Sequence, residues 1–290
     1  MKKKTVLAMI LEMTVVLAAC GTEAQAPATE PTEVAEAAAP TEEAPAENAE
    51  ATEAAEPTEA VAEAEPTEAE APAEEADIMS HADYIAAAVD DAVTVDVYVQ
   101  ATQSWWEDKI TVYAADEDGA YFIYNMACSE EDSEKLTQGA HILVNGFKGE
   151  WSGEVEIVDA TFEFLDGTYV VDKAEDVTAL LGKDELIDHQ NEFVAFTDLE
   201  VAAKQDADGK DVAFLYNWDG SGEPGSDLYF DVQDADGNVY TFTVESYLCG
   251  QDTDVYKAVE GLNIGDKVDL EGFLYWYEGV NPHITAVTVK

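Results

Sequence analysis

The sequence predicts a mainly β protein, with two tandem five-stranded barrels and short helices after a disordered acidic linker. Two observations predict this fold class. The composition changes near residue 78, where an Ala/Glu/Pro/Thr-rich segment gives way to alternating apolar segments separated by Asp-Gly turns. A set of short motifs then recurs in the same order in the second half of the chain. A length of 290 residues also favours about two domains.

The first residues have the form of a secretory signal. Lys2 to Lys4 precede a mostly apolar stretch over 6–19, which is too short and wrongly flanked for a stable membrane span. The run Leu17-Ala18-Ala19-Cys20-Gly21 resembles the lipobox, the cleavage site of bacterial lipoproteins. By that resemblance residues 1–19 are a removed signal peptide and Cys20 carries the lipid, whose acyl chains suffice for anchoring. The alternative is a plain secreted protein whose cysteine lies near the cut by chance.

Residues 20–77 predict a disordered tether. The segment has no basic or aromatic residue, holds seven prolines, and repeats Pro-Thr-Glu at 31–33, 40–42, 57–59 and 66–68. Such a composition buries too little apolar surface to offset the chain entropy of folding. Mutual repulsion of the glutamates and the stiffness of proline predict an extended linker that holds the folded part away from a membrane.

Residues 78–290 contain a duplication. Leu136-Thr137-Gln138-Gly139 and Asn145-Gly146-Phe147 match Leu262-Asn263-Ile264-Gly265 and Glu271-Gly272-Phe273 at the same spacing. Gly153 matches Gly279 at that spacing. Upstream, Asp118-Gly119 corresponds to Asp236-Gly237 and Cys128 to Cys249. Matched order over this much chain predicts two copies of one fold, over 78–172 and 173–290.

The residue pattern of each copy predicts five strands, with one helix between the third and the fourth strand. In the first copy the strands are expected at 93–101, 109–115, 120–126, 140–148 and 154–163, with a short helix at 129–136. In the second copy they are expected at 193–203, 227–233, 238–245, 266–276 and 283–289, with a helix at 252–260. Further helices are expected before each barrel, at 80–89 and 175–189. This element order is that of the OB-fold, with a five-stranded barrel of another topology as the alternative.

With these features together, the chain resembles a family of lipoproteins of anaerobic Gram-positive bacteria that join a lipobox signal, an acidic tether and tandem OB-fold domains. The barrel segments GEWSGEVEI and EGFLYWYEGVNPHIT carry the resemblance beside the lipobox. The resemblance implies this architecture and an extracytoplasmic, membrane-anchored location, and it implies no activity. It assigns no functional residue besides Cys20.

The charge bears on partners. The chain has 64 acidic residues, 13 lysines and no arginine, for a net charge of −51. A field of that sign repels polyanions, and the guanidinium forks that read bases are absent. We therefore expect no nucleic-acid partner. The same self-repulsion predicts a monomer and favours cations as ligands.

No catalytic or metal-binding set is found. None of the four histidines stands in a nucleophile-elbow, HExxH or paired-histidine context, so we expect no enzyme activity. The Cys and His spacing matches no zinc motif, and Cys128 and Cys249 are expected to be buried free thiols rather than a disulfide. We expect no cofactor. Asp206, Asp208 and Asp211 are weak calcium candidates, with ordinary turn chemistry as the favoured interpretation.

Aromatic residues supply the candidate ligand-binding site. Trp105 and Trp106 are adjacent on the loop after the first strand, so at most one of the two side chains can point inward. An aromatic platform rimmed by carboxylates suits a sugar face or an organic cation. Packing in the core is the competing interpretation for several of these rings. The candidates are Trp105, Trp106, Tyr121, Trp151, Trp218, Tyr275 and Trp276.

These observations predict a non-catalytic, lipid-anchored cell-surface protein. It would bind a small neutral or cationic ligand, or a glycan, through its barrel faces. A structural or assembly role, in which the barrels contact other envelope proteins, is one alternative. An envelope hydrolase with a hidden carboxylate pair is the other, ranked last.

Overall fold

A computed structural model describes residues 77–290. The predicted signal peptide, Cys20 and all of the predicted tether except Asp77 lie outside the described residues. Both barrels belong to one compact unit of the chain.

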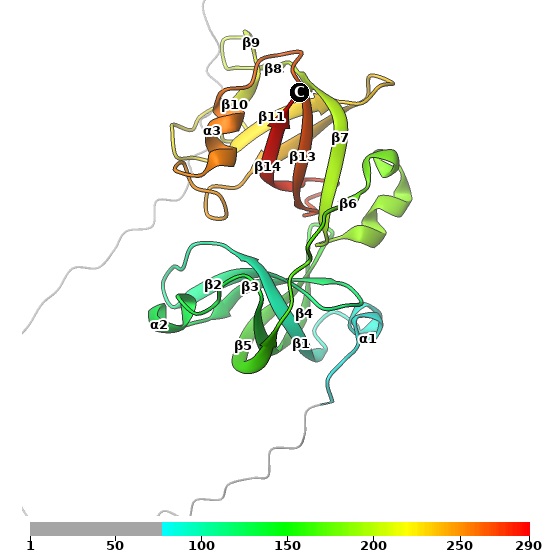
Figure 1. Ribbon diagram of the computed structural model, residues 1–290, viewed down its shortest axis with the longest axis vertical. Helices are drawn as coiled ribbons and strands as arrows, with labels where there is room; N and C mark the ends of the chain where they lie inside the picture. The colour runs from blue at the N-terminus through cyan, green and yellow to red at the C-terminus, as the bar shows by residue number, and fades with distance from the viewer. Residues whose placement is uncertain (1–76) are drawn as a thin grey trace, which may run out of the picture. The chain divides into compact units, whose positions relative to one another are not determined.

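The first barrel begins with a short helix and then closes a ring of five strands (Figure 1). The order around the ring is β1-β2-β3-β5-β4, in which β3 and β5 are parallel and the other neighbours antiparallel. Its elements are α1 (His81–Ala86), β1 (Ala92–Thr102), β2 (Lys109–Ala115), β3 (Ala120–Ala127), α2 (Glu130–Ser133), β4 (Ala140–Trp151) and β5 (Glu154–Thr168).

Local capping explains where its helices begin. The Ser80 hydroxyl accepts a hydrogen bond from the Asp83 amide, and the Ser129 hydroxyl accepts one from the Asp132 amide. Each bond satisfies an amide that has no partner within the helix. Both helices are shorter than the sequence predicts: α1 ends at Ala86, and α2 has only four residues.

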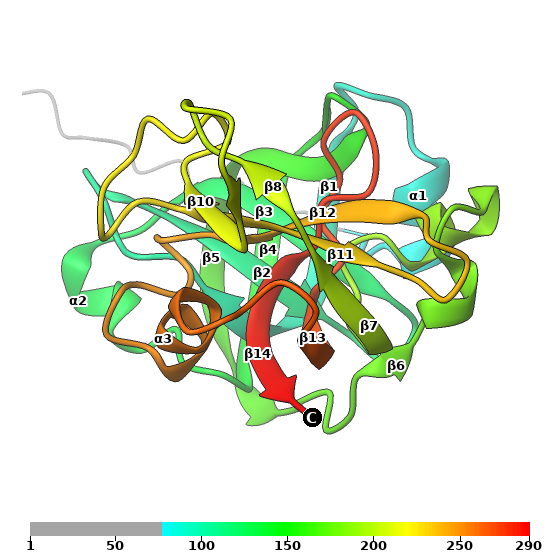
Figure 2. The ribbon, with the colours of Figure 1, turned by 90° about the horizontal axis from the view of Figure 1, so that it is seen from above.

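The second barrel repeats this plan. The order of neighbouring strands around this ring is β11-β12-β14-β13-β7, and pairing of β7 with β11 closes it. In Figure 2, α3 lies beside β14, which it contacts. Its elements are β6 (Glu175–Asp176), η1 (Thr178–Leu180), η2 (Asp184–His189), β7 (Phe193–Ala202), β8 (Lys204–Gln205), β9 (Asp211–Val212), β10 (Phe214–Tyr216), β11 (Leu228–Gln233), β12 (Val239–Val244), α3 (Asp254–Glu260), β13 (Lys267–Phe273) and β14 (His283–Val289).

The predicted fold class of two five-stranded barrels is therefore confirmed, with each strand of both rings close to its expected range. The α-helix expected over 175–189 is not formed. This segment instead contains a two-residue strand and two 3-10 helices. The Asp176 carboxylate accepts hydrogen bonds from the amide and hydroxyl of Thr178, and Gly182 adopts a φ of 72° between the two short helices. These local bonds compete with a continuous α-helix.

The duplicated glycines serve matching structural purposes. Gly146 and Gly272 lie at strand irregularities in β4 and β13, where an added Cβ would overlap atoms of the paired strand, β5 or β14. Gly139 and Gly265 share a left-handed backbone, with φ of 87° and 92°. The recurring motif therefore marks the positions where each barrel turns tightly or where two paired strands approach each other closely.

Each barrel encloses its own apolar core, and a third cluster lies between them. Tyr113, Phe122 and Phe273 form this third cluster, which brings the first barrel against the second. Cys128 and Cys249 are both buried and free, as the sequence predicts. Among the described residues, no helix has the length and apolar character to cross a membrane.

Candidate functional site

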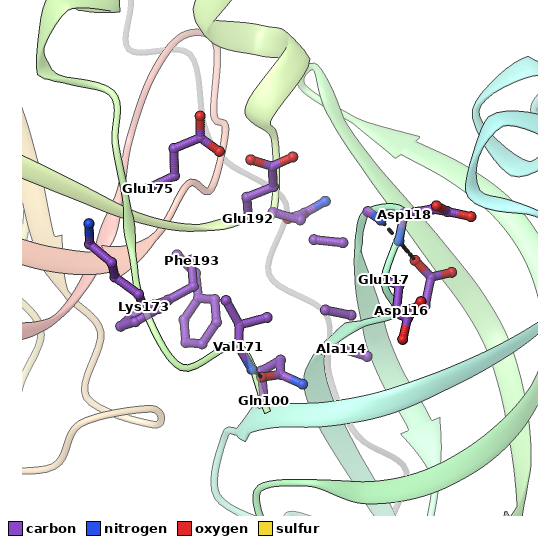
Figure 3. Close-up of a pocket in the computed structure, with 15 residues that line it drawn as sticks. Gln100, Ala114, Asp116, Glu117, Asp118, Val171, Lys173, Glu175, Glu192 and Phe193 are labelled. Atoms are coloured by element: carbon purple, nitrogen blue, oxygen red, sulfur yellow. Dashed lines mark hydrogen bonds between the residues drawn. The ribbon is translucent and has the colours of Figure 1, made fainter. Parts of the chain in front are cut away.

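Two hollows lie where the barrels meet. The first, which we call the aromatic groove, has a volume of about 330 Å³. The second, which we call the acidic cleft, has a volume of about 200 Å³ and is drawn in Figure 3. The aromatic groove is lined among others by Ser104, Trp106, Lys109, Tyr124, Glu245 and Tyr247.

A tight hairpin places Trp106 in the aromatic groove. The backbones of Trp106 and Lys109 exchange hydrogen bonds of 2.9 and 3.0 Å, with Glu107 and Asp108 between them at φ of 45° and 63°. Positive φ at both central residues is the signature of the hairpin turn that matches strand twist. The turn leaves the Trp106 side chain 66% exposed.

The second barrel completes the aromatic groove. The amide and hydroxyl of Ser104 both donate to the carbonyl of Tyr247, at 2.7 and 3.2 Å. Tyr247 is 59% exposed, and Tyr124, from β3, is 46% exposed. Three exposed aromatic rings from three separate segments therefore line one hollow.

The charge in the aromatic groove is mixed. Burial and the neighbouring Asp227 carboxylate raise the pKa of Glu245 to about 7. The Glu245 carboxylate accepts hydrogen bonds from the amides of Tyr247 and Leu248, at 3.2 and 2.8 Å. Lys109 is the lysine that lines the groove. The groove thus offers flat apolar faces beside a carboxyl group that changes charge near neutral pH.

The acidic cleft has a different chemistry. Asp116, Glu117 and Asp118 from the β2–β3 turn line it, and so do Glu175 and Glu192. Lys173 is the lysine on its wall. The Asp116 carboxylate accepts the amides of Asp118 and Gly119 at 2.7 and 2.8 Å, so part of this acidity stabilises the turn.

Of the adjacent pair of tryptophans, the structure places one in the groove and one against the core. Trp105 is half-buried, packs against the first core and donates its indole N–H to the carbonyl of Cys128 at 2.8 Å. Tyr121 is fully buried and donates its hydroxyl to Asp116 at 2.7 Å. Of the aromatic candidates, Trp106 lines the aromatic groove.

The remaining aromatic candidates lie apart from the groove. Trp151 and Trp218 are 60% and 75% exposed, and neither lines the groove or the cleft. Tyr275 stacks on His283 with ring centroids 4.3 Å apart, and Trp276 packs against the second core.

Tyr124 and Tyr247 were not among the sequence candidates. Alternation along β3 puts Tyr124 on the face opposite the buried Ile123, which is a signal that the sequence carries. Tyr247 belongs to the other barrel, and no local pattern relates it to Trp106.

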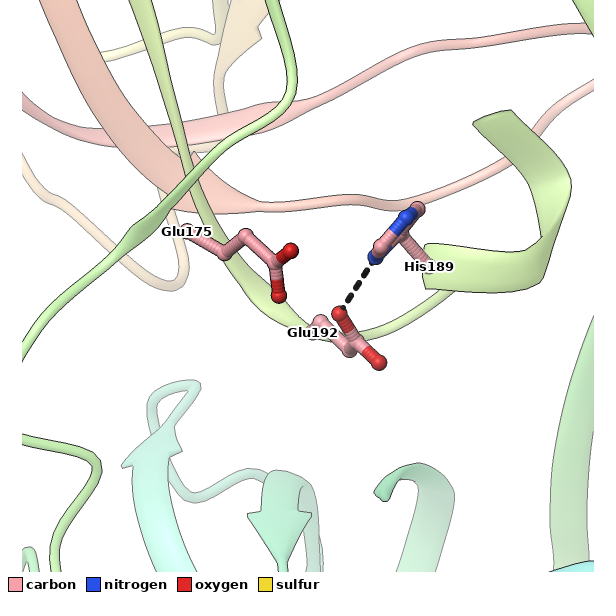
Figure 4. A group of neighbouring side chains, drawn as sticks. All are labelled: Glu175, His189 and Glu192. Carbon is pink, nitrogen blue, oxygen red and sulfur yellow. Dashed lines mark hydrogen bonds and ion pairs between the residues drawn. The ribbon is translucent and has the colours of Figure 1, made fainter. Parts of the chain in front are cut away.

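The calcium candidates form a hairpin turn. The Asp206 carboxylate accepts hydrogen bonds from the amides of Asp208 and Lys210, at 3.0 and 2.9 Å, between β8 and β9. Asp211 begins β9. Among the described residues, one group of side chains could hold a metal ion, namely Glu175, His189 and Glu192 (Figure 4).

Comparison with known proteins bears on the fold. No family model matches the chain, and no curated protein matches it. Among solved structures, a murine DNA-binding protein bound to double-stranded DNA is 11% identical, with a TM-score of 0.34, and the match covers 68% of this chain and 96% of that one. The Ifi202 HINa domain in complex with 20-bp double-stranded DNA is 14% identical, with a TM-score of 0.32 and coverages of 69% and 98%. At these identities the likeness extends to the fold alone.

The expectation of no nucleic-acid partner is corrected by this finding. The solved structures that match the chain include ones that hold double-stranded DNA, which is a property of those proteins, and charge was too weak a ground for excluding such a partner here. Net charge describes the field far from the molecule, and salt screens that field beyond about 8 Å at physiological ionic strength. The total charge therefore does not decide what a particular barrel surface contacts.

Proposed function

We propose that this protein is a non-catalytic binding protein that takes a small neutral or cationic ligand in the aromatic groove. The observation that carries the proposal is the convergence of Trp106, Tyr124 and Tyr247 on one hollow of about 330 Å³. Exposed aromatic rings that share a hollow provide flat apolar faces for a sugar ring or an organic cation.

The position of the groove in the barrel supports the proposal. Its lining comes from the loop between β1 and β2 and from strands β2 and β3 of the first barrel. In OB-folds this face and its flanking loops form the usual binding surface. The volume also lies near the lower end of the range for small-molecule sites, roughly 300–1,000 Å³.

We also propose an extracytoplasmic location, anchored through lipid at Cys20. The lipobox-like run that ends in Cys20 and the basic segment before it support this part of the proposal. Metabolic labelling with a palmitate analogue in a bacterial host tests it. The wild-type chain is expected to incorporate label and fractionate with membranes, whereas Cys20→Ser is expected to do neither.

Ligand titration followed by tryptophan fluorescence tests the groove. The probes are chitotriose for a glycan, choline and spermidine for cations, and a 12-bp DNA duplex, each titrated into the full chain. We expect saturable binding of chitotriose, choline or spermidine that Trp106→Ala and Tyr247→Ala weaken at least about tenfold, since a desolvated contact between a cation and an aromatic face contributes about 2 kcal/mol.

Trp218→Ala is the matched control, because Trp218 is 75% exposed and lies outside the groove. It is expected to bind as the wild type does. Equal weakening in Trp106→Ala and Trp218→Ala would reject the groove as the site. A panel in which only the duplex binds, independently of Trp106, would also reject it, and capture of one envelope protein by the Trp106 face would support the assembly alternative instead.

A further inference from the structure

We propose that Glu175, His189 and Glu192 form a binding site for a divalent transition-metal ion, with Zn²⁺ as the best fit. Each of the three residues offers one ligand atom, and these atoms all lie within 4.8 Å of one another. The Nδ1 atom of His189 lies 2.8 Å from a carboxylate oxygen of Glu192, and Figure 4 shows the Glu175 carboxylate turned toward the same space. This site is separate from the aromatic groove and does not depend on it.

Strand pairing brings the three residues together. Parallel pairing of β6 with β7 sets Glu175 opposite Val194, two residues after Glu192. His189 ends the short helix η2, and the amide of Glu192 donates to its carbonyl at 3.1 Å. Residues 189–192 therefore form a tight turn that carries two of the ligands.

The two residues between these ligands hold the turn in place. The Gln190 side chain donates to the carbonyl of Gly153 at 2.8 Å and accepts the amide of Val155 at 3.2 Å. The Asn191 side chain donates to the carbonyl of Val155 at 3.2 Å, and its amide donates to the carbonyl of Leu274 at 2.9 Å. A metal site requires ligands whose positions are fixed by their surroundings, and this anchoring supplies that.

The electrostatics favour a cation. Among the described residues, neither Glu175 nor Glu192 forms an ion pair with a lysine. Both line the acidic cleft, whose opposite wall carries Asp116, Glu117 and Asp118. Glu192 contacts the His189 imidazole instead, and a divalent ion would compensate the charge of both carboxylates.

A second observation at the same wall is an unpartnered oxygen. Asn191 is only 4% exposed and lines the acidic cleft, and its side-chain oxygen has no hydrogen-bond partner among the described residues. A buried carboxamide oxygen without a partner costs about 1–3 kcal/mol unless a water or an ion satisfies it. The wall of the cleft thus carries a buried hydrogen-bond acceptor, the side-chain oxygen of Asn191, that no other described residue satisfies.

The donor set selects the metal. Imidazole nitrogen and carboxylate oxygen are both common zinc ligands, and three protein ligands leave the fourth position of a tetrahedral ion open. Ligand atoms about 2.1 Å from a tetrahedral ion lie roughly 3.4 Å apart. The ligand atoms of this group lie within 4.8 Å of one another, so small side-chain movements would bring them to that spacing. Calcium prefers six to eight oxygen ligands and is poorly served by an imidazole.

Isothermal titration calorimetry of ZnCl₂ into the full chain, after treatment with a chelator and its removal, tests the proposal. We expect saturable binding of one ion per chain. His189→Gln and Glu175→Gln are each expected to weaken binding at least about tenfold. With Co²⁺ as a spectroscopic probe, the wild type is expected to show visible absorption bands of a low-symmetry site, and His189→Gln is expected to lose them.

His141→Gln is the matched control, because His141 also contacts a carboxylate, that of Asp96, but belongs to no group of three possible metal ligands in the described part of the chain. It is expected to bind zinc as the wild type does. Absence of zinc binding, binding that survives His189→Gln, or equal loss in His141→Gln would each overturn the proposal. Calcium binding with the same dependence on His189 would overturn the choice of a nitrogen-preferring metal.

Discussion

The phenolic oxygen of Tyr113 in β2 lies 2.7 Å from Nδ1 of His283 in β14, although 170 residues separate them in the chain. Both residues are buried, and the Tyr113 ring also stacks on Phe273 with centroids 4.3 Å apart. A hydrogen bond and an aromatic stack therefore join the two barrels away from water, where an unmet polar group is costly. This contact is one of those that join the two barrels in one compact unit.

Tyr113→Phe should destabilise the protein by about 1–3 kcal/mol, because His283 would keep its burial and lose its partner. Urea unfolding at pH 7 measures the change. Tyr216→Phe, which removes a hydrogen bond to Glu260 at the surface, serves as the control and should cost less than about 1 kcal/mol. Equal costs in the two variants would contradict the importance of the buried bond.

Buried titratable groups predict that stability falls as the pH rises from 5 to 8. Burial raises the pKa of Glu154 to about 8, and burial together with Asp227 raises that of Glu245 to about 7, from an ordinary value of 4.5. In that window the folded chain holds protons that the unfolded chain has released, so the free energy of unfolding decreases with pH. Burial lowers the pKa of His283 from 6.5 to about 3, so its contribution has the opposite sign and is lost as the pH falls from 6.5 toward 3. Between 4.5 and 6.5 the two carboxyl groups outweigh the single histidine.

Glu154→Gln tests the sign. The backbone N–H of Trp276 donates a hydrogen bond to the Glu154 carboxylate at 2.8 Å. A glutamine side chain keeps an oxygen that can accept this bond, but it does not titrate. Unfolding free energies at pH 5, 6.5 and 8 should show a shallower decline in the variant, by up to about 1.4 kcal/mol per pH unit between the two pKa values. Glu130→Gln, at an exposed helix position, should leave the decline unchanged. A wild-type stability that rises from pH 5 to 8 would refute the prediction.

The adjacent tryptophans should separate stability from binding. Trp105→Ala removes a core contact and the hydrogen bond to Cys128, so we expect a loss of about 2 kcal/mol or more. Trp106→Ala changes an exposed side chain and should stay within about 0.5 kcal/mol of the wild type. Thermal and urea unfolding of the two variants, measured side by side, check this, and similar losses would show that both rings pack in the core.

Gly272→Ala should be strongly destabilising. Its added Cβ would overlap the carbonyl oxygen of His283 and lie 2.8 Å from the Ile284 Cα, both of which are backbone atoms of β14. Backbone cannot rotate away as a flexible side chain can, so we expect a cost of about 1–3 kcal/mol or more. Gly250→Ala is the control, since its Cβ would meet one atom, at 3.5 Å, and it should change stability little. Unfolding of both variants in urea distinguishes them.

The strand positions of both barrels could be predicted because their signals are local. Apolar alternation marks each strand, Asp118-Gly119 and Asp236-Gly237 mark matching hairpins, and Ser80 caps the first helix. Even the duplication rests on local needs, since Gly139 and Gly265 adopt the same left-handed backbone. Where local signals compete, as they do around Asp176 and Gly182, the predicted helix was replaced by shorter turns.

The strands, the turns and the element order of the two barrels thus follow from local residue patterns. Packing of the folded chain sets which of Trp105 and Trp106 faces solvent, and it brings Tyr247 beside Trp106 where the barrels meet. Only pairing of β6 with β7 brought Glu175 to His189 and Glu192. The physical reason is that backbone and turn preferences act between near neighbours in the chain, whereas candidate sites form where the barrels dock and where strands pair across long separations. Those contacts depend on the closing of both rings, which no local pattern of residues records.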